Sequence, residues 1–108
     1  MAGIPQLSVR ELQAMRTRGD RLVLLDVREP WEIAIVRLPD SVDIPLHEIP
    51  ERLKELDAQS AIIVMCRSGA RSQVAAEFLF NQGFTGVSNL AGGILAWARE
   101  IDPKLPTY

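Results

Sequence analysis

The sequence predicts an α/β fold: a small, mainly parallel sheet with helices on both faces. Short apolar segments alternate with amphipathic ones, and residues 21–26 and 61–65 hold continuous apolar runs. Continuous runs are typical of strands buried on both faces, and strands that alternate with helices form βαβ units with parallel neighbours. A chain of 108 residues is expected to form a single domain over residues 1–108. We expect the core over about residues 7–100 and an irregular tail over residues 101–108.

The first helix is expected over residues 8–18. Ser8 and Glu11 have the spacing of a capping box, in which each side chain bonds a backbone N–H at the start of the helix. Gly19 favours the left-handed conformation that commonly ends a helix. The strand over residues 21–26 follows.

Three short elements are expected before the central strand. Pro30 suits the first position of a short helix that starts within residues 29–32. Residues 41–44 are expected to form a short strand. Residues 47–56 have the pattern of an amphipathic helix, and Pro50 indicates that the regular part begins there, because proline lacks the N–H that a helix interior requires.

The strongest strand and helix patterns lie in the second half of the chain. Residues 61–65 are apolar and rich in β-branched side chains, as strands are. Residues 71–82 predict a helix with Gly83 as its C-cap. The apolar stripe of that helix is expected to hold Val74, Ala75, Phe78 and Leu79. A last strand over residues 87–90 precedes a helix over residues 92–100 that two glycines open.

Composition and charge are those of an ordinary globular protein. Hydrophobic residues make up 47% of the chain, and 12 basic side chains against 14 acidic ones leave a net charge of -2. This balance does not indicate nucleic acid or an anionic membrane as a partner. No apolar run approaches the ~20 residues that span a bilayer, and the N-terminal segment lacks a secretory pattern. We therefore expect a cytoplasmic protein whose thiol stays reduced.

The one cysteine, Cys66, occupies a position where parallel sheets bind ligands. It directly follows the strand at residues 61–65, and residues 66–71 (C-R-S-G-A-R) lead into the next helix. Ligands bind at the carboxyl ends of parallel strands. A loop this short must curl around the cysteine Sγ with its N–H groups inward, next to the free N–H groups of the helix. The sequence therefore predicts an anion-binding loop.

The residues of this loop also predict a reactive thiolate. Arg67 and Arg71 add positive charge, and Gly69 permits a left-handed backbone. Cationic neighbours and helix N-termini lower the pKa of a cysteine below its free value of about 8.5. The alternative for Cys66 is a small buried hydrophobic residue, as free cysteines often are, but its polar neighbours disfavour it. A lone cysteine excludes an intrachain disulfide and a metal site with several cysteines.

Four segments together resemble the single-domain rhodanese family. They are residues 26–32 (D-V-R-E-P-W-E), 39–45 (P-D-S-V-D-I-P), 65–72 (M-C-R-S-G-A-R-S) and 89–97 (N-L-A-G-G-I-L-A-W). The match covers about residues 7–100 in the order and spacing of the family. The resemblance implies an α/β sulfurtransferase that needs no metal or organic cofactor. Such a protein takes a sulfane sulfur from a donor such as thiosulfate, holds it as a cysteine persulfide and passes it to a thiol or cyanide.

The resemblance also implies roles for the loop residues. It makes Cys66 the nucleophile. The substrate-binding loop comprises Arg67, Ser68, Gly69, Ala70 and Arg71, whose backbone N–H groups would surround the persulfide. Arg67 matches a position that is often cationic in members that use thiosulfate, where it would help to bind the sulfonate. Arg71 either faces the substrate or forms a structural ion pair with Asp26 or Glu32, and the ion pair is favoured.

Loop length favours one reaction class over another. Phosphatases and arsenate reductases that are similar to rhodaneses have five residues between the cysteine and the arginine, and the larger ring suits a tetrahedral oxyanion. Four residues separate Cys66 from Arg71 here, which favours sulfur transfer over hydrolysis of oxyanion esters. A non-catalytic sulfur-carrier or regulatory module is the other alternative, and the intact loop argues against it.

Several other residues are expected to be structural. This set comprises Asp26, Arg28, Glu32, Trp31 and Trp97, the two tryptophans in the core or at its edge. His47 lies in a polar stretch far from Cys66 in sequence, and a ring of N–H groups makes a base unnecessary, so no catalytic role is expected for it.

Two segments bear on local geometry and on partners. Residues 36–41 (V-R-L-P-D-S) stand where many rhodaneses have Gly-His-Ile-Pro-Gly-Ala, so the geometry of that turn is open. The tail over residues 101–108 resembles the ending of rhodanese domains that are fused to enzymes activating ubiquitin-like sulfur carriers. This likeness suggests a sulfur-carrier protein as a partner.

Overall fold

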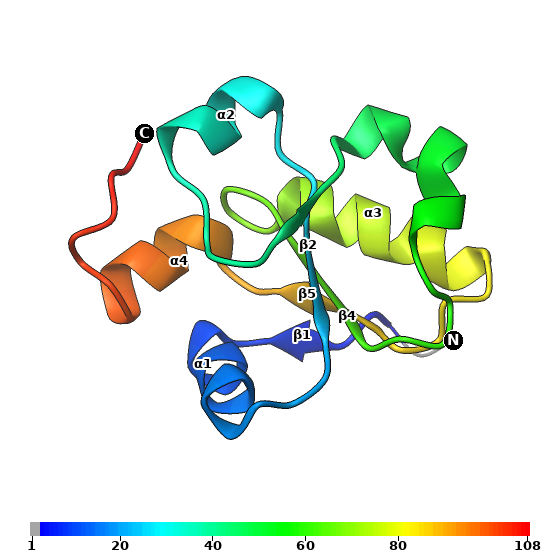
Figure 1. The fold of residues 1–108 in the computed structure, drawn as a ribbon, viewed down its shortest axis with the longest axis horizontal. Coiled ribbons are helices and arrows are strands. Elements are labelled where there is room, and N and C mark those ends of the chain that lie inside the picture. The colour runs from blue at the N-terminus through cyan, green and yellow to red at the C-terminus, as the bar shows by residue number, and fades with distance from the viewer. Residues whose placement is uncertain (1–2) are drawn as a thin grey trace.

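A five-stranded parallel sheet forms the centre of the computed structural model, which describes residues 3–108 (Figure 1). Its strand order is β1-β5-β4-β2-β3, and every neighbouring pair is parallel. The strands are β1 (Gln6–Leu7), β2 (Val23–Asp26), β3 (Val42–Asp43), β4 (Ile62–Met65) and β5 (Val87–Leu90). The predicted α/β fold with a small parallel sheet is confirmed.

Helices cover both faces of this sheet. They are α1 (Val9–Arg18), α2 (Pro30–Ile35), the 3-10 helix η1 (Leu46–Glu55), α3 (Ala70–Asn81) and α4 (Gly93–Glu100). One core cluster joins the sheet to α3 and η1, and a second joins it to α1 and α4. In Figure 1, α2 lies beyond the end of β2, and none of its residues belongs to either cluster.

The position of β4 between two layers of helices explains why its sequence is apolar throughout. Ile62 and Val64 belong to the cluster beneath α3, whereas Ile63 and Met65 belong to the cluster beneath α4. Successive side chains of a strand point to opposite faces, so a central strand with helices on both sides needs an apolar residue at every position. All four side chains are buried.

The ends of the first helix follow the predicted pattern. The Ser8 hydroxyl accepts a hydrogen bond from the Glu11 N–H at 3.1 Å, and the Glu11 carboxylate accepts one from the Ser8 N–H at 3.0 Å. Gly19 ends α1 with a left-handed φ of 75°. Local sequence therefore determines the two ends of this helix, because each of these residues acts on backbone groups within about one turn of itself.

Two elements differ from the prediction. The segment predicted as a helix over residues 47–56 is the 3-10 helix η1, with Pro50 inside it and a non-helical residue, Arg52. Proline removes a hydrogen-bond donor and collides with the preceding turn, so an α-helix cannot run through it. Strand β1 was not predicted, because two residues carry no periodicity; it forms by pairing with β5.

The predicted apolar stripe of α3 is partly wrong. Its buried positions are Ser72, Ala75, Ala76 and Leu79, which have the spacing of one helix face. Val74 lies off that face and is 55% exposed. It lines a small apolar pocket of about 170 Å³ together with Leu46, Ile49, Pro50, Ala75 and Phe78. The C-cap of α3 is Gln82, and the left-handed Gly83 comes one residue later.

The two tryptophans have different surroundings. Trp97 is buried in the cluster of α1 and α4, as predicted. Trp31 is 62% exposed, so the prediction of a position in the core or at its edge is wrong for it. Its ring and the Tyr108 ring form a T-shaped pair, with centroids 5.8 Å apart.

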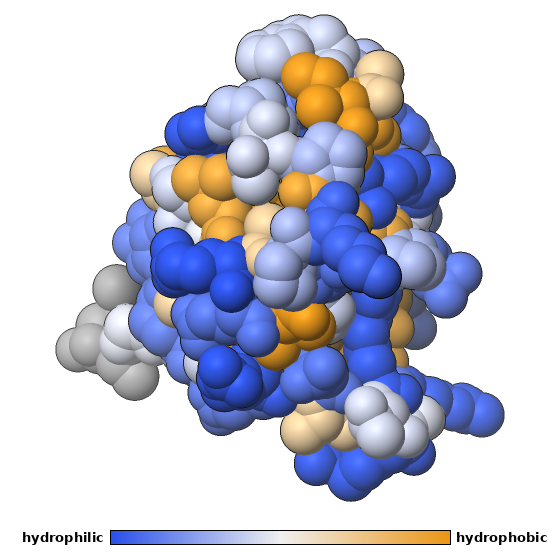
Figure 2. Space-filling view, turned by 90° about the vertical axis from the view of Figure 1, so that its left-hand side faces the viewer, coloured by the Kyte–Doolittle hydropathy of each residue, from blue (hydrophilic) through white to orange (hydrophobic). Residues whose placement is uncertain are grey.

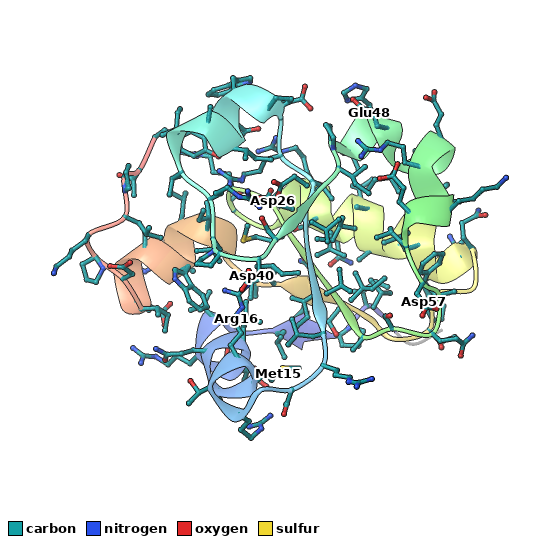
Figure 3. All side chains as sticks on the ribbon, in the orientation of Figure 1. Met15, Arg16, Asp26, Asp40, Glu48 and Asp57 are labelled. Carbon is teal, nitrogen blue, oxygen red and sulfur yellow. The ribbon has the colours of Figure 1, made fainter. Side chains whose placement is uncertain are left out.

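A fully buried ion pair lies where β2 ends (Figure 3). Asp26 and Arg28 are both 0% exposed, and the Arg28 Nη2 lies 2.7 Å from the Asp26 carboxylate. Arg28 also donates to the main-chain oxygens of Val36 and Glu32 and to the Tyr108 hydroxyl. The guanidinium thus ties β2 to the end of α2 and to the tail, which is the structural role predicted for this pair.

Removing one member of this pair is expected to destabilise the fold strongly. Asp26→Ala leaves the Arg28 charge buried without a counter-charge, and the free energy of unfolding should fall by about 3–5 kcal/mol. Asp20→Ala is the matched control, because Asp20 pairs with Arg18 on the surface and an exposed pair contributes less than about 1 kcal/mol. Urea denaturation measures both. Equal losses in the two variants would contradict a stabilising role for the buried pair.

Candidate active site

Cys66 follows the last residue of β4, at the carboxyl edge of a central strand. Four residues later the chain enters α3, whose first residue is Ala70. The loop therefore turns from strand to helix around the cysteine, as the sequence predicts.

Hydrogen-bond donors surround the Cys66 sulfur. The Gly69 N–H donates to Sγ at 3.0 Å, and the Ser72 hydroxyl donates to it at 3.3 Å. Burial raises the pKa of the thiol, but the hydrogen bonds of the Ser72 hydroxyl and of the Ser72, Gly69 and Ser68 N–H groups lower it, and the balance is a pKa below the ordinary value. The predicted shift toward the thiolate is confirmed in its direction.

Cys66 is also buried, with 1% of its surface exposed. It belongs to the core cluster that contains Ile49 and Ala75. Burial alone agrees with the alternative of a small apolar core residue. An apolar role does not explain the two hydrogen bonds that the sulfur accepts from Gly69 and Ser72. The site combines a desolvated sulfur with polar groups that stabilise its anion.

Contacts with the first turn of α4 impose the shape of the loop. The Ile94 N–H donates to the Cys66 carbonyl at 3.0 Å, and the Leu95 N–H donates to the Arg67 carbonyl at 3.1 Å. These N–H groups belong to the first turn of α4 and have no partner within their helix. Because the two carbonyls face α4, the N–H groups further along the loop are free to face the sulfur.

Two glycines allow this close approach. A Cβ on Gly93 would lie 2.5 Å from the carbonyl oxygens of both Cys66 and Arg67. Gly69 has a left-handed φ of 109°, which few other residues adopt. The Asn89 side chain holds this residue by donating to the Gly69 carbonyl at 3.1 Å.

Arg71 forms an ion pair with Glu32, one of the two partners that the sequence left open. Its two terminal nitrogens donate to the two carboxylate oxygens at 2.6 and 2.9 Å. The Arg71 guanidinium lowers the pKa of Glu32 to about 2, although burial opposes this shift. The same pair raises the pKa of Arg71. The Arg71 charge therefore holds α2 against the start of α3.

Arg67, expected to help bind a sulfonate, lies along the tail. Its Nε donates to the main-chain oxygen of Tyr108 at 2.8 Å, and its Nη2 donates to the same oxygen. The guanidinium carbon is 5.1 Å from the centroid of the Tyr108 ring. The structure thus brings the tail to the loop, a contact that no sequence pattern predicts.

Four residues that contact the loop were given no role in the site from the sequence. They are Ser72, Asn89, Gly93 and Tyr108. The double glycine directly after a strand was the clearest available signal, although the sequence alone indicates only the start of a helix there. His47, by contrast, is exposed and lies 3.6 Å from the carboxylates of Glu29 and Glu48.

Within residues 3–108, no three His, Cys, Asp or Glu side chains are grouped so that they could hold a metal ion. None of the helices in this range is long and apolar enough to cross a membrane. The cytoplasmic location stays a prediction.

Residues 8–100 match the family model described as a rhodanese-like domain. The chain is 46% identical over 79 residues to a sulfurtransferase of Allochromatium vinosum, which covers 73% of this chain and 74% of that protein. It is 38% identical over 101 residues to the putative sulfurtransferase YtwF of Bacillus subtilis, covering 94% and 97% of the two chains. A rhodanese-related protein of Thermoplasma volcanium superimposes with a TM-score of 0.82 at 31% identity, covering 90% and 93%.

Two further relatives differ in length. The adenylyltransferase and sulfurtransferase MOCS3-1 of Zea mays is 36% identical over 95% of this chain, which spans only 24% of that protein. The putative sulfur carrier protein YrkF of B. subtilis is 35% identical over 94% of this chain, which spans 55% of that protein.

Ser72→Ala is expected to raise the pKa of Cys66, because the variant loses a hydrogen bond that favours the thiolate. Iodoacetamide alkylates the thiolate, so the rate of alkylation rises with pH through the thiol pKa, and the variant's midpoint should lie at higher pH. Ser68→Ala is the control, since Ser68 is exposed and acts on the sulfur through its N–H. An unchanged midpoint in Ser72→Ala would show that its hydroxyl does not stabilise the anion.

Gly93→Ala is expected to destabilise the protein more than Gly19→Ala. Both positions have a left-handed φ, of 57° and 75°, which costs about 1–2 kcal/mol for alanine. Only at Gly93 would the new Cβ also collide with loop carbonyls, whereas Gly19 has nothing within 4 Å. Such overpacking adds about 1–3 kcal/mol. Thermal and urea unfolding measure the difference, and equal losses would argue against tight packing of the loop on α4.

Proposed function

The chain belongs to the rhodanese-like domain family, and from this premise we propose that it transfers sulfane sulfur through a persulfide on Cys66. The donor is thiosulfate or a related sulfane-sulfur compound, and the acceptor is a thiol or cyanide. The observation that carries the proposal is the pair of donors, the Gly69 N–H and the Ser72 hydroxyl, aimed at a buried sulfur.

In the first step, the Cys66 thiolate attacks the outer sulfur of thiosulfate. A sulfur–sulfur bond forms to Sγ, and the bond between the sulfane sulfur and the sulfonate sulfur breaks. Sulfite leaves with the electron pair, and the anionic charge of the thiolate moves to the outer sulfur of the persulfide. No proton is transferred, so the step needs a thiolate and no general base.

In the second step, cyanide or a thiolate attacks the outer sulfur of the persulfide. The bond to Sγ breaks, its electron pair returns to Cys66, and thiocyanate or a new persulfide leaves. The protein's contribution is electrostatic in both steps, because fixed N–H groups stabilise a sulfur anion without reorganising.

The small size of the loop favours a single sulfur atom as the group that Cys66 carries. The donors closest to Sγ come from Gly69 and Ser72 within a tight turn, and α4 holds the carbonyls of that turn from outside. Cys66 is nearly sealed, while Ser68 and Ala70 on the outer side of the loop are exposed. A slender sulfur chain suits this approach better than a bulky ester.

A sulfur carrier is the second candidate. The relative named as a putative sulfur carrier protein favours it. A carrier would also hold sulfur on Cys66, but it would release it only to its partner. Turnover with small acceptors separates the two candidates.

Thiosulfate is expected to increase the mass of the intact protein by one sulfur atom, and cyanide is expected to remove this sulfur as thiocyanate. Mass spectrometry of the desalted protein measures the first step, and a colorimetric thiocyanate assay measures the second. Cys66→Ser, which retains the size of the side chain, should show neither.

A folded protein whose mass stays unchanged with thiosulfate and with a thiol persulfide would contradict the proposal. A mass gain without repeated turnover would instead favour the carrier.

A further inference from the structure

The tail runs back from the end of α4 to the side of α2 (Figure 1), and its last residue contacts Arg67 of the active-site loop. Figure 2 looks onto this side of the molecule, which is mostly hydrophilic, with several small hydrophobic patches, one of them at the top. Leu105 and Tyr108 pack against the core cluster of α1 and α4. The tail is therefore a docked segment with a defined position.

Tyr108 is held at several points. Its hydroxyl accepts a hydrogen bond from the Arg28 Nη1 at 2.9 Å and donates one to the Glu32 carboxylate at 2.7 Å. Both partners are buried. The Tyr108 ring forms a T-shaped pair with the Trp31 ring. These contacts fix the position of the Tyr108 main-chain oxygen.

That oxygen accepts hydrogen bonds from two nitrogens of Arg67, Nε and Nη2. The Arg67 Nε and Nη2 form a planar fork, which is the geometry that binds two oxygens of a sulfonate or carboxylate. With Tyr108 docked, the fork faces the tail. The other arginine of the loop, Arg71, has both terminal nitrogens on Glu32. Both guanidinium groups of the loop are thus bound to protein oxygens.

We propose that Tyr108 is a specificity-determining residue that acts through Arg67. By holding the Arg67 fork, the docked tail disfavours donors whose sulfane sulfur is attached to a sulfonate, such as thiosulfate. It favours donors whose sulfane sulfur is carried by a thiol, which need no cation at the outer end. This inference rests on the proposed sulfur transfer at Cys66 and names the donor class of that site.

The test compares two donors in the first step. Thiosulfate carries a sulfonate, whereas the persulfide of 2-mercaptoethanol carries none. In Tyr108→Ala the end of the tail loses the contacts with Arg28, Glu32 and Trp31 that hold its main-chain oxygen, and Arg67 becomes available to the sulfonate. The KM for thiosulfate should then fall about tenfold, since one charge-assisted hydrogen bond is at stake. The KM for the persulfide should change less than about twofold.

Two further variants separate specificity from stability. Tyr108→Phe retains the ring and loses only the hydroxyl contacts, so its KM for thiosulfate should lie between those of the parent protein and Tyr108→Ala. Adding Arg67→Ala to Tyr108→Ala should abolish the gain. The gain should also shrink with added salt, because a freed guanidinium attracts thiosulfate electrostatically. A merely structural role of Tyr108 would change both donors alike.

The outcomes distinguish this inference from the proposed function. If Tyr108→Ala changes both donors by the same factor, or weakens thiosulfate alone, the inference is overturned while sulfur transfer stands. If the parent protein takes sulfur from neither donor, the proposed function fails. The hold of Tyr108 on Arg67 is measured independently from the Arg67 Nε–H resonance, which should shift and exchange faster in Tyr108→Ala; an unchanged resonance also overturns the inference.

Discussion

The site depends on one arrangement of peptide groups: the first turn of α4 binds the carbonyls of Cys66 and Arg67. The backbone of a tight turn presents both N–H and C=O groups. A sulfur anion is stabilised by the N–H groups and repelled by the carbonyl oxygens. Because α4 takes the carbonyls from outside, the N–H groups can converge on Sγ. One anion site thus depends on two segments that are far apart in sequence. Residues 66–69 form the loop around the sulfur, and residues 92–95 bind its carbonyls. Gly93 is the position where any side chain would separate them.

Burial and ionisation of Cys66 oppose each other, and the structure contains both. Removing a thiolate from water raises its pKa, so the buried position alone would keep the sulfur neutral. The hydrogen bonds from Ser72, Gly69 and Ser68 outweigh this effect in direction. The same dry surroundings strengthen each hydrogen bond to the anion, because little water competes for it. A core-like cysteine and a reactive cysteine are therefore compatible descriptions of one residue.

The charged groups around the loop are paired with one another in a connected network, so their charges are not free to act on a substrate. Asp26 neutralises Arg28, Glu32 neutralises Arg71, and Tyr108 links Arg28, Glu32 and Arg67. Such pairs orient side chains, and they leave less charge for a substrate than a count of arginines suggests. The tail is part of this set, which gives it a route to influence the chemistry at Cys66 without touching the sulfur.

Local patterns in the sequence determined the elements whose signals act over a few residues: the capping box of α1, the Gly19 stop, the apolar β4 and the position of Cys66 after it. They also carried the family resemblance, because the loop motif is contiguous. Strand β1, the exposure of Trp31 and Val74, the choice of Glu32 as the Arg71 partner and the docking of Tyr108 on Arg67 were decided only by tertiary structure. Each of these features depends on contacts between residues that are far apart in the sequence. The spacing of residues along the chain does not indicate which distant segments come into contact.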